Sequence, residues 1–249
     1  GHLPIFPIMF VSIACGAISG FHATQSPLMA RCIKNENMGR PVFFGAMITE
    51  GIVALIWAAA ATYFYHNNGM GESNAAVIVD SITKEWLGTV GGILAVLGVI
   101  AAPITSGDTA FRSARLIVAD FLHKEQKSMS SRLMICIPMF IVAIGILLYS
   151  QKDKDGFDMI WRYFAWTNQT LAVFTLWALT VFLARSKKLY IVTLIPALFM
   201  TAVCSTYIFV APEGLGMDVT VSQTIGCIIT AITLVAFLCW KKKNKTVDY

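Results

Sequence analysis

Polar and helix-breaking residues crowd the stretch GAISGFHATQSPLMARC, residues 16–32, at the end of an apolar run. Backbone in hydrocarbon must pair internally, so a helix can be interrupted there only where protein or a water-filled cavity supplies partners. One interpretation is packing of small residues followed by an interfacial loop. The other is an interrupted helix whose backbone and side chains bind a substrate or ion. We favour the second, which makes the candidate substrate-binding residues Ser19, Gly20, His22, Thr24 and Gln25.

A single carboxylate, Glu50, lies inside the next apolar run. An ionised carboxylate at that depth costs at least ~2.5 kcal/mol. It is either a neutral, hydrogen-bonded structural acid or a proton carrier, and the sequence leaves both open. Histidine side chains titrate near physiological pH. The candidate proton-coupling residues are therefore Glu50 and His22.

Hydroxyl side chains gather in APITSGDTAFR, residues 101–112. Pro103 frees a backbone carbonyl, and hydroxyl oxygens are hard donors of the kind that small cations accept. The candidate ion-binding residues are Thr105, Ser106 and Thr109. Asp108 and Arg112 are spaced i, i+4, which predicts a structural ion pair on the helix surface. The competing explanation is structural: the hydroxyl groups cap helix ends, and Asp108 and Arg112 form an ion pair.

Two amides stand together in WTNQT, residues 166–170. Amide side chains inside a membrane often link helices, and they can also contact substrate. Asn168 and Gln169 are candidates for either role.

The composition indicates an all-α integral membrane protein. The 249 residues are 57% apolar and 13% charged, against about 25% charged in soluble domains. The net charge of +5 resides in short loops, which argues against nucleic-acid binding. The six cysteines lack zinc-ligand spacing and are interpreted as packing residues. We expect no metal site and no cofactor.

Apolar runs long enough to cross the bilayer predict seven transmembrane helices, at about 3–22, 42–65, 87–106, 133–150, 161–183, 189–210 and 219–240. An amphipathic cytoplasmic helix is expected at 106–122. We divide the chain into a transporter core segment, 1–127, and a C-terminal four-helix transmembrane region, 128–249.

Basic residues alternate between the predicted loops, with fifteen of the 19 Lys and Arg on one side. By the positive-inside rule that side is cytoplasmic. The N-terminus of the chain is therefore expected outside and the C-terminus inside.

The motifs SIACGAISGFHATQSPLMARC, GRPVFFGAMITEGIVALIWAAAATY, APITSGDTAFRSARLIVADF and RYFAWTNQTLAVFTLWALTVFL resemble the carbon starvation protein A family of bacterial transporters, over essentially the whole chain. The resemblance implies uptake of pyruvate or short peptides across the bacterial plasma membrane during carbon starvation, by ion-coupled symport, with protons expected over sodium. The chain has QSP at 25–27 where many members have TTP-like residues.

The resemblance also implies a fold of the LeuT type, with two inverted repeats. The seven spans would be helices six to twelve, the second half of that architecture, and the missing N-terminal half of the same protein would complete the substrate site. Residues 16–27 would be the unwound middle of the interrupted helix. Thr105, Ser106 and Thr109 would lie near the sodium position of LeuT-type transporters.

Two other classes of function compete with transport as explanations of the sequence. A membrane sensor or structural module is the main alternative. An intramembrane serine hydrolase using Ser19 and His22 is disfavoured, because nucleophile and base should come from different helices and the chain has no GxSxG or HExxH motif. We therefore expect no enzymatic activity.

Overall fold

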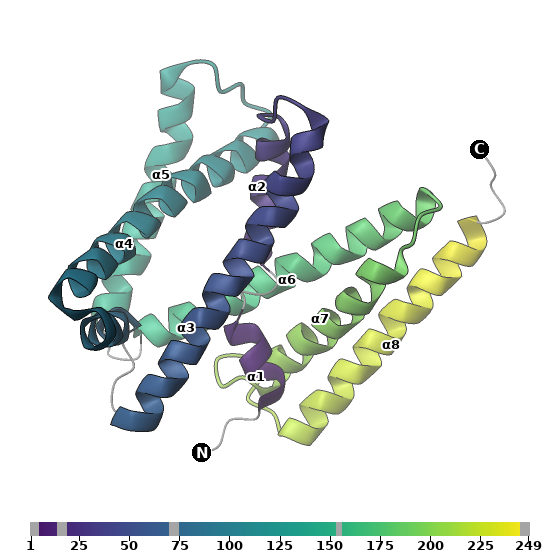
Figure 1. Ribbon diagram of the computed structural model, residues 1–249. Helices are drawn as coiled ribbons and strands as arrows, with labels where there is room; N and C mark the ends of the chain where they lie inside the picture. The colour runs from purple at the N-terminus through teal and green to yellow at the C-terminus, as the bar shows by residue number, and fades with distance from the viewer. Residues whose placement is uncertain (1–4, 14–18, 70–74, 153–155, 245–249) are drawn as a thin grey trace. The chain divides into compact units, whose positions relative to one another are not determined.

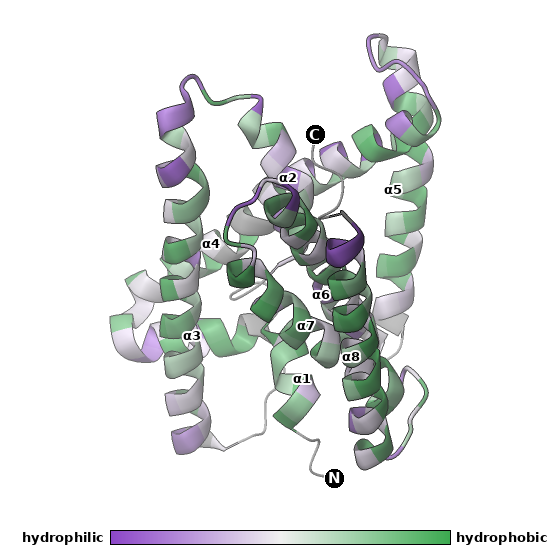
Figure 2. Ribbon diagram, turned by 90° about the vertical axis from the view of Figure 1, so that its right-hand side faces the viewer, coloured by the Kyte–Doolittle hydropathy of each residue, from purple (hydrophilic) through white to green (hydrophobic). Residues whose placement is uncertain are grey.

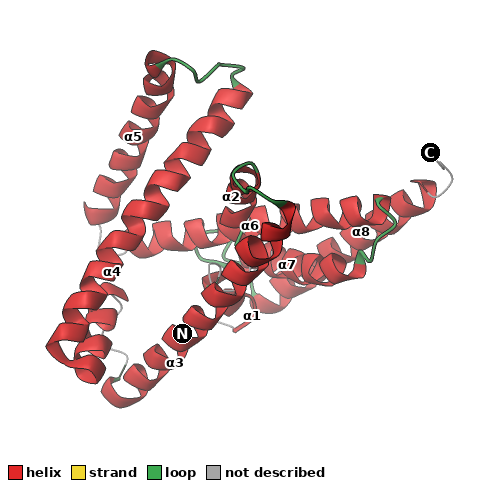
Figure 3. Ribbon diagram, turned by 45° about the horizontal axis from the view of Figure 1, so that its top comes forward, coloured by secondary structure: helices red, strands yellow, loops and turns green. Residues whose placement is uncertain are grey.

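The computed structural model describes residues 5–13, 19–69, 75–152 and 156–244. These residues form helices joined by loops, and no strand occurs among them (Figure 3). The prediction of an all-α protein is confirmed for this part of the chain. The chain divides into two compact units, residues 1–28 with 148–249 and residues 29–147. The expected boundary at residue 127 falls inside the second unit, and its functional meaning stays a prediction.

The first unit contains α1 (Ile5–Ser12), most of α2 (Phe21–Ala30), α6 (Gly156–Arg185), α7 (Ile191–Val210) and α8 (Val219–Asn244). Helix α7 lies at its centre and packs against α1, α6 and α8 (Figure 1). The core is apolar and is built around α7, from Val11, Ala165, Met200, Val203, Cys204, Tyr207 and Ala211.

Polar bonds link the helices of this unit within their apolar surroundings. The Trp177 indole N–H donates to the Thr201 hydroxyl at 3.0 Å. The Thr180 hydroxyl lies 2.9 Å from that of Thr193. Interhelical hydrogen bonds of this kind fix the rotation of one helix against the next where lipid offers no alternative partner.

Close packing of α7 and α8 depends on a glycine. A Cβ on Gly226 would collide with the Thr206 hydroxyl of α7. Asp218 caps the N-terminus of α8. Its carboxylate accepts the Thr220 backbone N–H at 2.8 Å and so satisfies one of the free donors of the first turn.

The second unit contains a 3₁₀ turn (Glu36–Met38), a π-helical turn (Arg40–Gly45), α3 (Ala46–Asn68), α4 (Ala75–Phe121) and most of α5 (Met129–Lys152). Helices α3 and α4 meet through Ala60, Ile78 and Ile82. Helix α4 turns at Gly88, whose φ of +68° is a left-handed value that glycine adopts without strain.

Five stretches of the described chain are long and apolar enough to cross a membrane. They are Glu36–Asn67, Met129–Ser150, Met159–Arg185, Ile191–Val210 and Val219–Lys243. Figure 2 shows the hydrophobic colouring that dominates α5, α7 and α8. The protein is therefore a multi-pass membrane protein, and these stretches correspond to five of the seven predicted spans.

The other two predicted spans differ from expectation. Residues 3–22 do not form one continuous helix, because α1 ends at Ser12. Residues 87–106 lie within the longer helix α4, which continues from Thr89 to Phe121 without a further break. The stretch 106–122, expected as a separate amphipathic helix, is thus the continuation of α4.

Candidate functional site

The interruption expected near the N-terminus occurs between α1 and α2. Helix α1 ends at Ser12, Ser19 and Gly20 are not helical, and α2 begins at Phe21. Gly16 lies outside the described residues. The first bonds of the new helix run from the His22 N–H to the Ser19 carbonyl and from the Ala23 N–H to the Gly20 carbonyl, at 3.3 and 3.0 Å.

The expected end of the interruption was wrong. Residues 21–27 were predicted to be unwound, yet they form most of α2. The Thr24 hydroxyl donates to the Phe21 carbonyl and the Ser26 hydroxyl to the His22 carbonyl, both at 2.7 Å. Hydroxyl groups that bond back to their own helix in this way are compatible with helical backbone, although the same residue types often occur in turns.

The Asn168 side chain of α6 hydrogen-bonds to the start of α2. Its Oδ1 accepts the Phe21 backbone N–H at 2.8 Å, and its Nδ2 donates to the Ser19 hydroxyl at 3.1 Å. The Phe21 N–H is one of the donors that the first turn of a helix leaves without an intrahelical partner. Asn168 is 6% exposed, so its two bonds satisfy groups that water reaches poorly.

Gln169, the next residue of α6, reaches the other side of the interruption. Its Nε2 donates to the Phe10 carbonyl in the last turn of α1, at 3.1 Å. That carbonyl belongs to the set that the end of a helix leaves unpaired. Gln169 is 1% exposed, and its Oε1 has no hydrogen-bond partner among the described residues.

Gly20 allows α6 to approach the interruption. A Cβ at this position would collide with the Asn168 backbone carbonyl and lie 2.6 Å from the Leu171 Cβ. Small residues permit such close approach of two backbones in membrane proteins. The structure therefore brings four of the predicted site residues together: Ser19, Gly20, Asn168 and Gln169.

The remaining predicted residues of α2 lie just beyond this cluster. His22, Thr24 and Gln25 are each partly buried on that helix. The ring of His22 makes an edge contact with the ring of Phe21, with centroids 6.5 Å apart.

Of the two candidate proton-coupling residues, Glu50 belongs to the second unit and His22 to the first, and the candidate ion-binding residues also belong to the second unit. Glu50 is partly buried on α3. Ser106 is exposed and Thr109 is partly buried on α4, and the side chain of Thr105 lies outside the described part of the structure. Asp108 and Arg112 form an ion pair at 2.6 Å, with both side chains mostly exposed. Within the described residues, no three His, Cys, Asp or Glu side chains are grouped to hold a metal ion.

A polar cluster in the first unit was not foreseen from the sequence. The Glu213 carboxylate, in the loop between α7 and α8, accepts the Tyr207 hydroxyl at 2.5 Å and lies 3.3 Å from the Arg162 Nε. The Tyr163 hydroxyl donates to the Glu213 backbone carbonyl at 2.8 Å. The Glu213 side chain is only 5% exposed. Neither Glu213 nor Arg162 was among the predicted site residues.

Comparison with known proteins gives one consistent family. The sequence profile of the family described as carbon starvation protein CstA matches residues 2–88 and 66–207. No solved structure matches the chain.

Three relatives illustrate the range of similarity. An uncharacterised protein of Haemophilus influenzae is 43% identical over 132 residues, which cover 53% of this chain and 91% of the relative. The peptide transporter CstA of Bacillus subtilis is 28% identical over 268 residues, covering 87% of this chain and 45% of the relative. The pyruvate/proton symporter BtsT of Escherichia coli is 42% identical over 59 residues, covering 23% of this chain and 8% of the relative.

The chain thus spans less than half of either relative that is named as a transporter. The profile match nevertheless covers most of its residues, including α1, α2 and the α6 amides that join them. On this evidence the chain belongs to the carbon starvation protein CstA family.

Proposed function

We propose that this chain is part of a secondary active transporter that takes up pyruvate or short peptides across the bacterial plasma membrane. Two relatives point in this direction, since one is named a peptide transporter and another a pyruvate/proton symporter. The chain would supply one half of the substrate site, and an N-terminal half of the same protein would supply the other.

The observation that carries the proposal is the interrupted helix α1–α2 with α6 bonded to both of its ends. Maintaining an interruption among apolar helices requires partners for the freed backbone groups. Asn168 and Gln169 provide two of them. In secondary transporters, discontinuous helices with such ends form the substrate and ion sites. The substrate would therefore bind beside Ser19 and Gly20, within reach of the side chains at the start of α2.

The mechanism we propose is alternating access, in which one group of helices rocks against another around this site. Protons would drive accumulation through Glu50 or His22, with sodium as the alternative coupling ion. The chain would begin outside the cell and end in the cytoplasm, as the distribution of basic loops predicts.

The test is uptake of radiolabelled pyruvate and of a labelled dipeptide into liposomes that contain the full-length protein. With an inward proton gradient, we expect accumulation of one substrate above its external concentration. Dissipating the gradient with a protonophore should abolish that accumulation. Uptake driven by a sodium gradient in the absence of a proton gradient would identify sodium as the coupling ion instead.

A matched pair of variants links the uptake to the interrupted helix. Asn168→Ala removes the closer of the two acceptors of the Phe21 N–H, whereas Thr167→Ala alters an exposed neighbour that bonds to its own helix. Uptake should fall at least tenfold in the first and stay unchanged in the second. Normal uptake by Asn168→Ala would exclude this site, and absence of uptake for both substrates would leave the sensor as the better hypothesis.

A further inference from the structure

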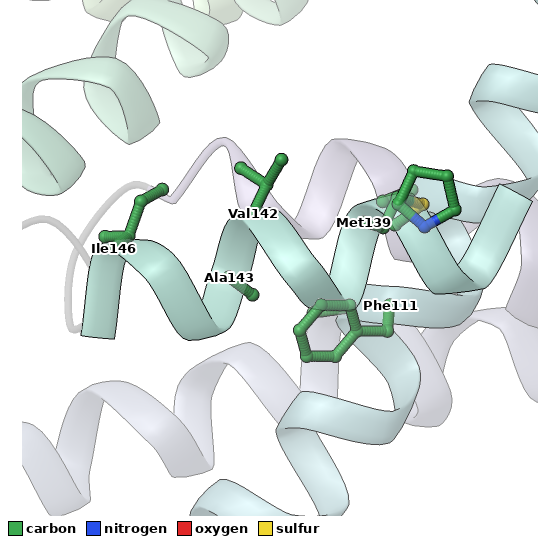
Figure 4. Close-up of a pocket in the computed structure, with 8 residues that line it drawn as sticks. Phe111, Met139, Val142, Ala143 and Ile146 are labelled. Atoms are coloured by element: carbon green, nitrogen blue, oxygen red, sulfur yellow. The ribbon is translucent and has the colours of Figure 1, made fainter. Parts of the chain in front are cut away.

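A groove of about 480 Å³ lies between α4 and α5 in the second unit. Its lining is apolar and includes Phe111 and Ala114 of α4 and Met139, Val142, Ala143 and Ile146 of α5. Figure 4 shows Phe111 on one helix and the other labelled side chains spaced along α5. The lining residues of α5 recur every three or four positions, so they form one face of that helix.

One of the two helices that border the groove, α5, is long and apolar enough to cross a membrane. Only 11% of the apolar stretch of α5 is buried inside the structure, and Phe140, Ile141 and Val142 are all exposed. Among the described residues nothing covers this face of α5, so the apolar groove beside it is open to an acyl chain.

Two arginines lie on the same faces, toward the loop that joins the helices. Arg115 follows Phe111 by four residues, one turn along α4. Arg132 precedes Met139 by seven residues, two turns along α5. Both residues therefore lie on the loop side of the residues that line the groove.

These two cations lack acidic partners in the described part of the chain. The Arg115 Nε is buried and makes no hydrogen bond there. The Arg132 Nε donates to the neutral Gln126 carbonyl at 2.8 Å. Of the acids near this end of the groove, Asp108 binds Arg112 and Glu125 lies 3.2 Å from Lys127. Asp120 is exposed near the end of α4 and makes no ion pair with either arginine in the described structure. Arg115 is partly buried, whereas Arg132 is exposed. A partly buried guanidinium without a counter-charge is unfavourable, so Arg115 favours an anion at this end of the groove.

The distances fit one leaflet of a bilayer. From Arg132 to Ile146 the helix rises about 21 Å at ~1.5 Å per residue. Half of a bilayer, headgroups included, measures about 20–22 Å. A phosphate at the arginines would therefore place an acyl chain along the groove with its end near the bilayer midplane.

We propose that this groove binds an anionic phospholipid, with its phosphate between Arg115 and Arg132 and one acyl chain against Phe111, Met139 and Ile146. Basic pockets between transmembrane helices bind anionic headgroups in this way. The lipid fills the space between two helices and supplies the counter-charge that the described residues do not provide. This site is separate from the interrupted helix and does not depend on the transported substrate.

The test is native mass spectrometry of the delipidated full-length protein with phosphatidylglycerol or phosphatidylcholine of identical chains. We expect retention of phosphatidylglycerol in preference to phosphatidylcholine. Each basic residue near a headgroup strengthens binding about fivefold, so the double variant Arg115→Gln, Arg132→Gln should lose roughly thirtyfold in affinity for phosphatidylglycerol. The double variant Arg31→Gln, Arg40→Gln removes the same charge from exposed positions elsewhere and should retain the lipid.

A second variant tests the groove itself. Ala143→Phe fills the space that the acyl chain would occupy and should reduce binding of both lipids, while a melting curve by circular dichroism verifies that the variant is folded. The proposal is overturned by equal retention of the two lipids, or by unchanged binding to either designed variant. A dimeric species without lipid that Ala143→Phe converts to monomer would identify a second copy of the protein as the occupant instead.

Discussion

Asn168 and Gln169, adjacent on α6, hydrogen-bond to opposite sides of the same helix interruption. Asn168 accepts the first backbone N–H of α2, and Gln169 donates to a carbonyl in the last turn of α1. One turn of a continuous helix therefore fixes both ends of a discontinuous one. Any change in the position of α6 would be transmitted directly to the residues beside Ser19 and Gly20.

The first prediction concerns the Asn168 side chain. Asn168→Ala removes the 2.8 Å acceptor of the Phe21 N–H and leaves it only the Ser19 hydroxyl at 3.3 Å, and such a hydrogen bond contributes about 0.5–1.5 kcal/mol. The free energy of unfolding, measured by denaturant titration in detergent, should fall by that amount. Asn168→Asp keeps the acceptor oxygen and should restore part of the loss, which a purely steric role would not explain. Thr175→Ala, at a partly buried position of α6 whose hydroxyl bonds within its own helix, should change little.

The second prediction concerns the close approach at Gly20. Gly20→Ala forces a Cβ against the Asn168 backbone and the Leu171 side chain, and such overpacking typically costs about 1–3 kcal/mol. We expect a lower melting temperature and reduced uptake. Gly98→Ala is the matched control, because no atom lies within 4 Å of a Cβ there and alanine is favoured over glycine inside a helix by about 0.5–1 kcal/mol. Equal stability of the two variants would contradict the packing that we describe.

The interruption could be predicted from the sequence, but its extent could not. Glycine and serine at the end of an apolar run indicated a break, and Ser19 and Gly20 are indeed non-helical. Thr24, Ser26 and Pro27 belong to residue types that occur in loops as well, and only the structure shows the hydroxyls bonded back to their own helix. Local residue types do not reveal which of these competing bonds is made.

Contacts between distant parts of the chain were harder to predict. The amides of WTNQT indicated a link between helices, but their partners lie 147 and 159 residues away. Glu213 gave no signal, because an acid in a loop near a span is ordinary in a membrane protein. Its burial follows from the packing of α6 against α7, which no local pattern specifies.

The third prediction separates the two tyrosines that bond to Glu213. The buried Tyr207 donates to the carboxylate, whereas Tyr163, 43% exposed, donates to the backbone carbonyl. Hydrogen bonds to charged groups contribute about 1.5–3 kcal/mol and neutral ones about 0.5–1.5. Tyr207→Phe should therefore lower the free energy of unfolding more than Tyr163→Phe, as measured by thermal or denaturant unfolding. The reverse order would mean that the loop is held by its backbone contact rather than by the Glu213 carboxylate.

The fourth prediction distinguishes proton coupling from a structural role for Glu50. Glu50→Gln keeps the size and hydrogen-bonding capacity of the side chain but removes its ability to release a proton. If Glu50 carries the coupling proton, accumulation of substrate driven by a proton gradient should fall at least tenfold, while exchange of internal for external substrate continues. Exchange continues because it needs the binding site and the conformational change but no net proton movement.

The control for this experiment is Glu36→Gln, which neutralises an exposed acid in the turn before α3. It should leave both accumulation and exchange intact. Loss of both activities in Glu50→Gln, together with a lower melting temperature, would assign Glu50 to the structure of α3. Retention of both activities would move the coupling role to His22, and His22→Gln in the same assay would then be expected to abolish accumulation alone. Uptake that survives in both variants would exclude the two residues as proton carriers.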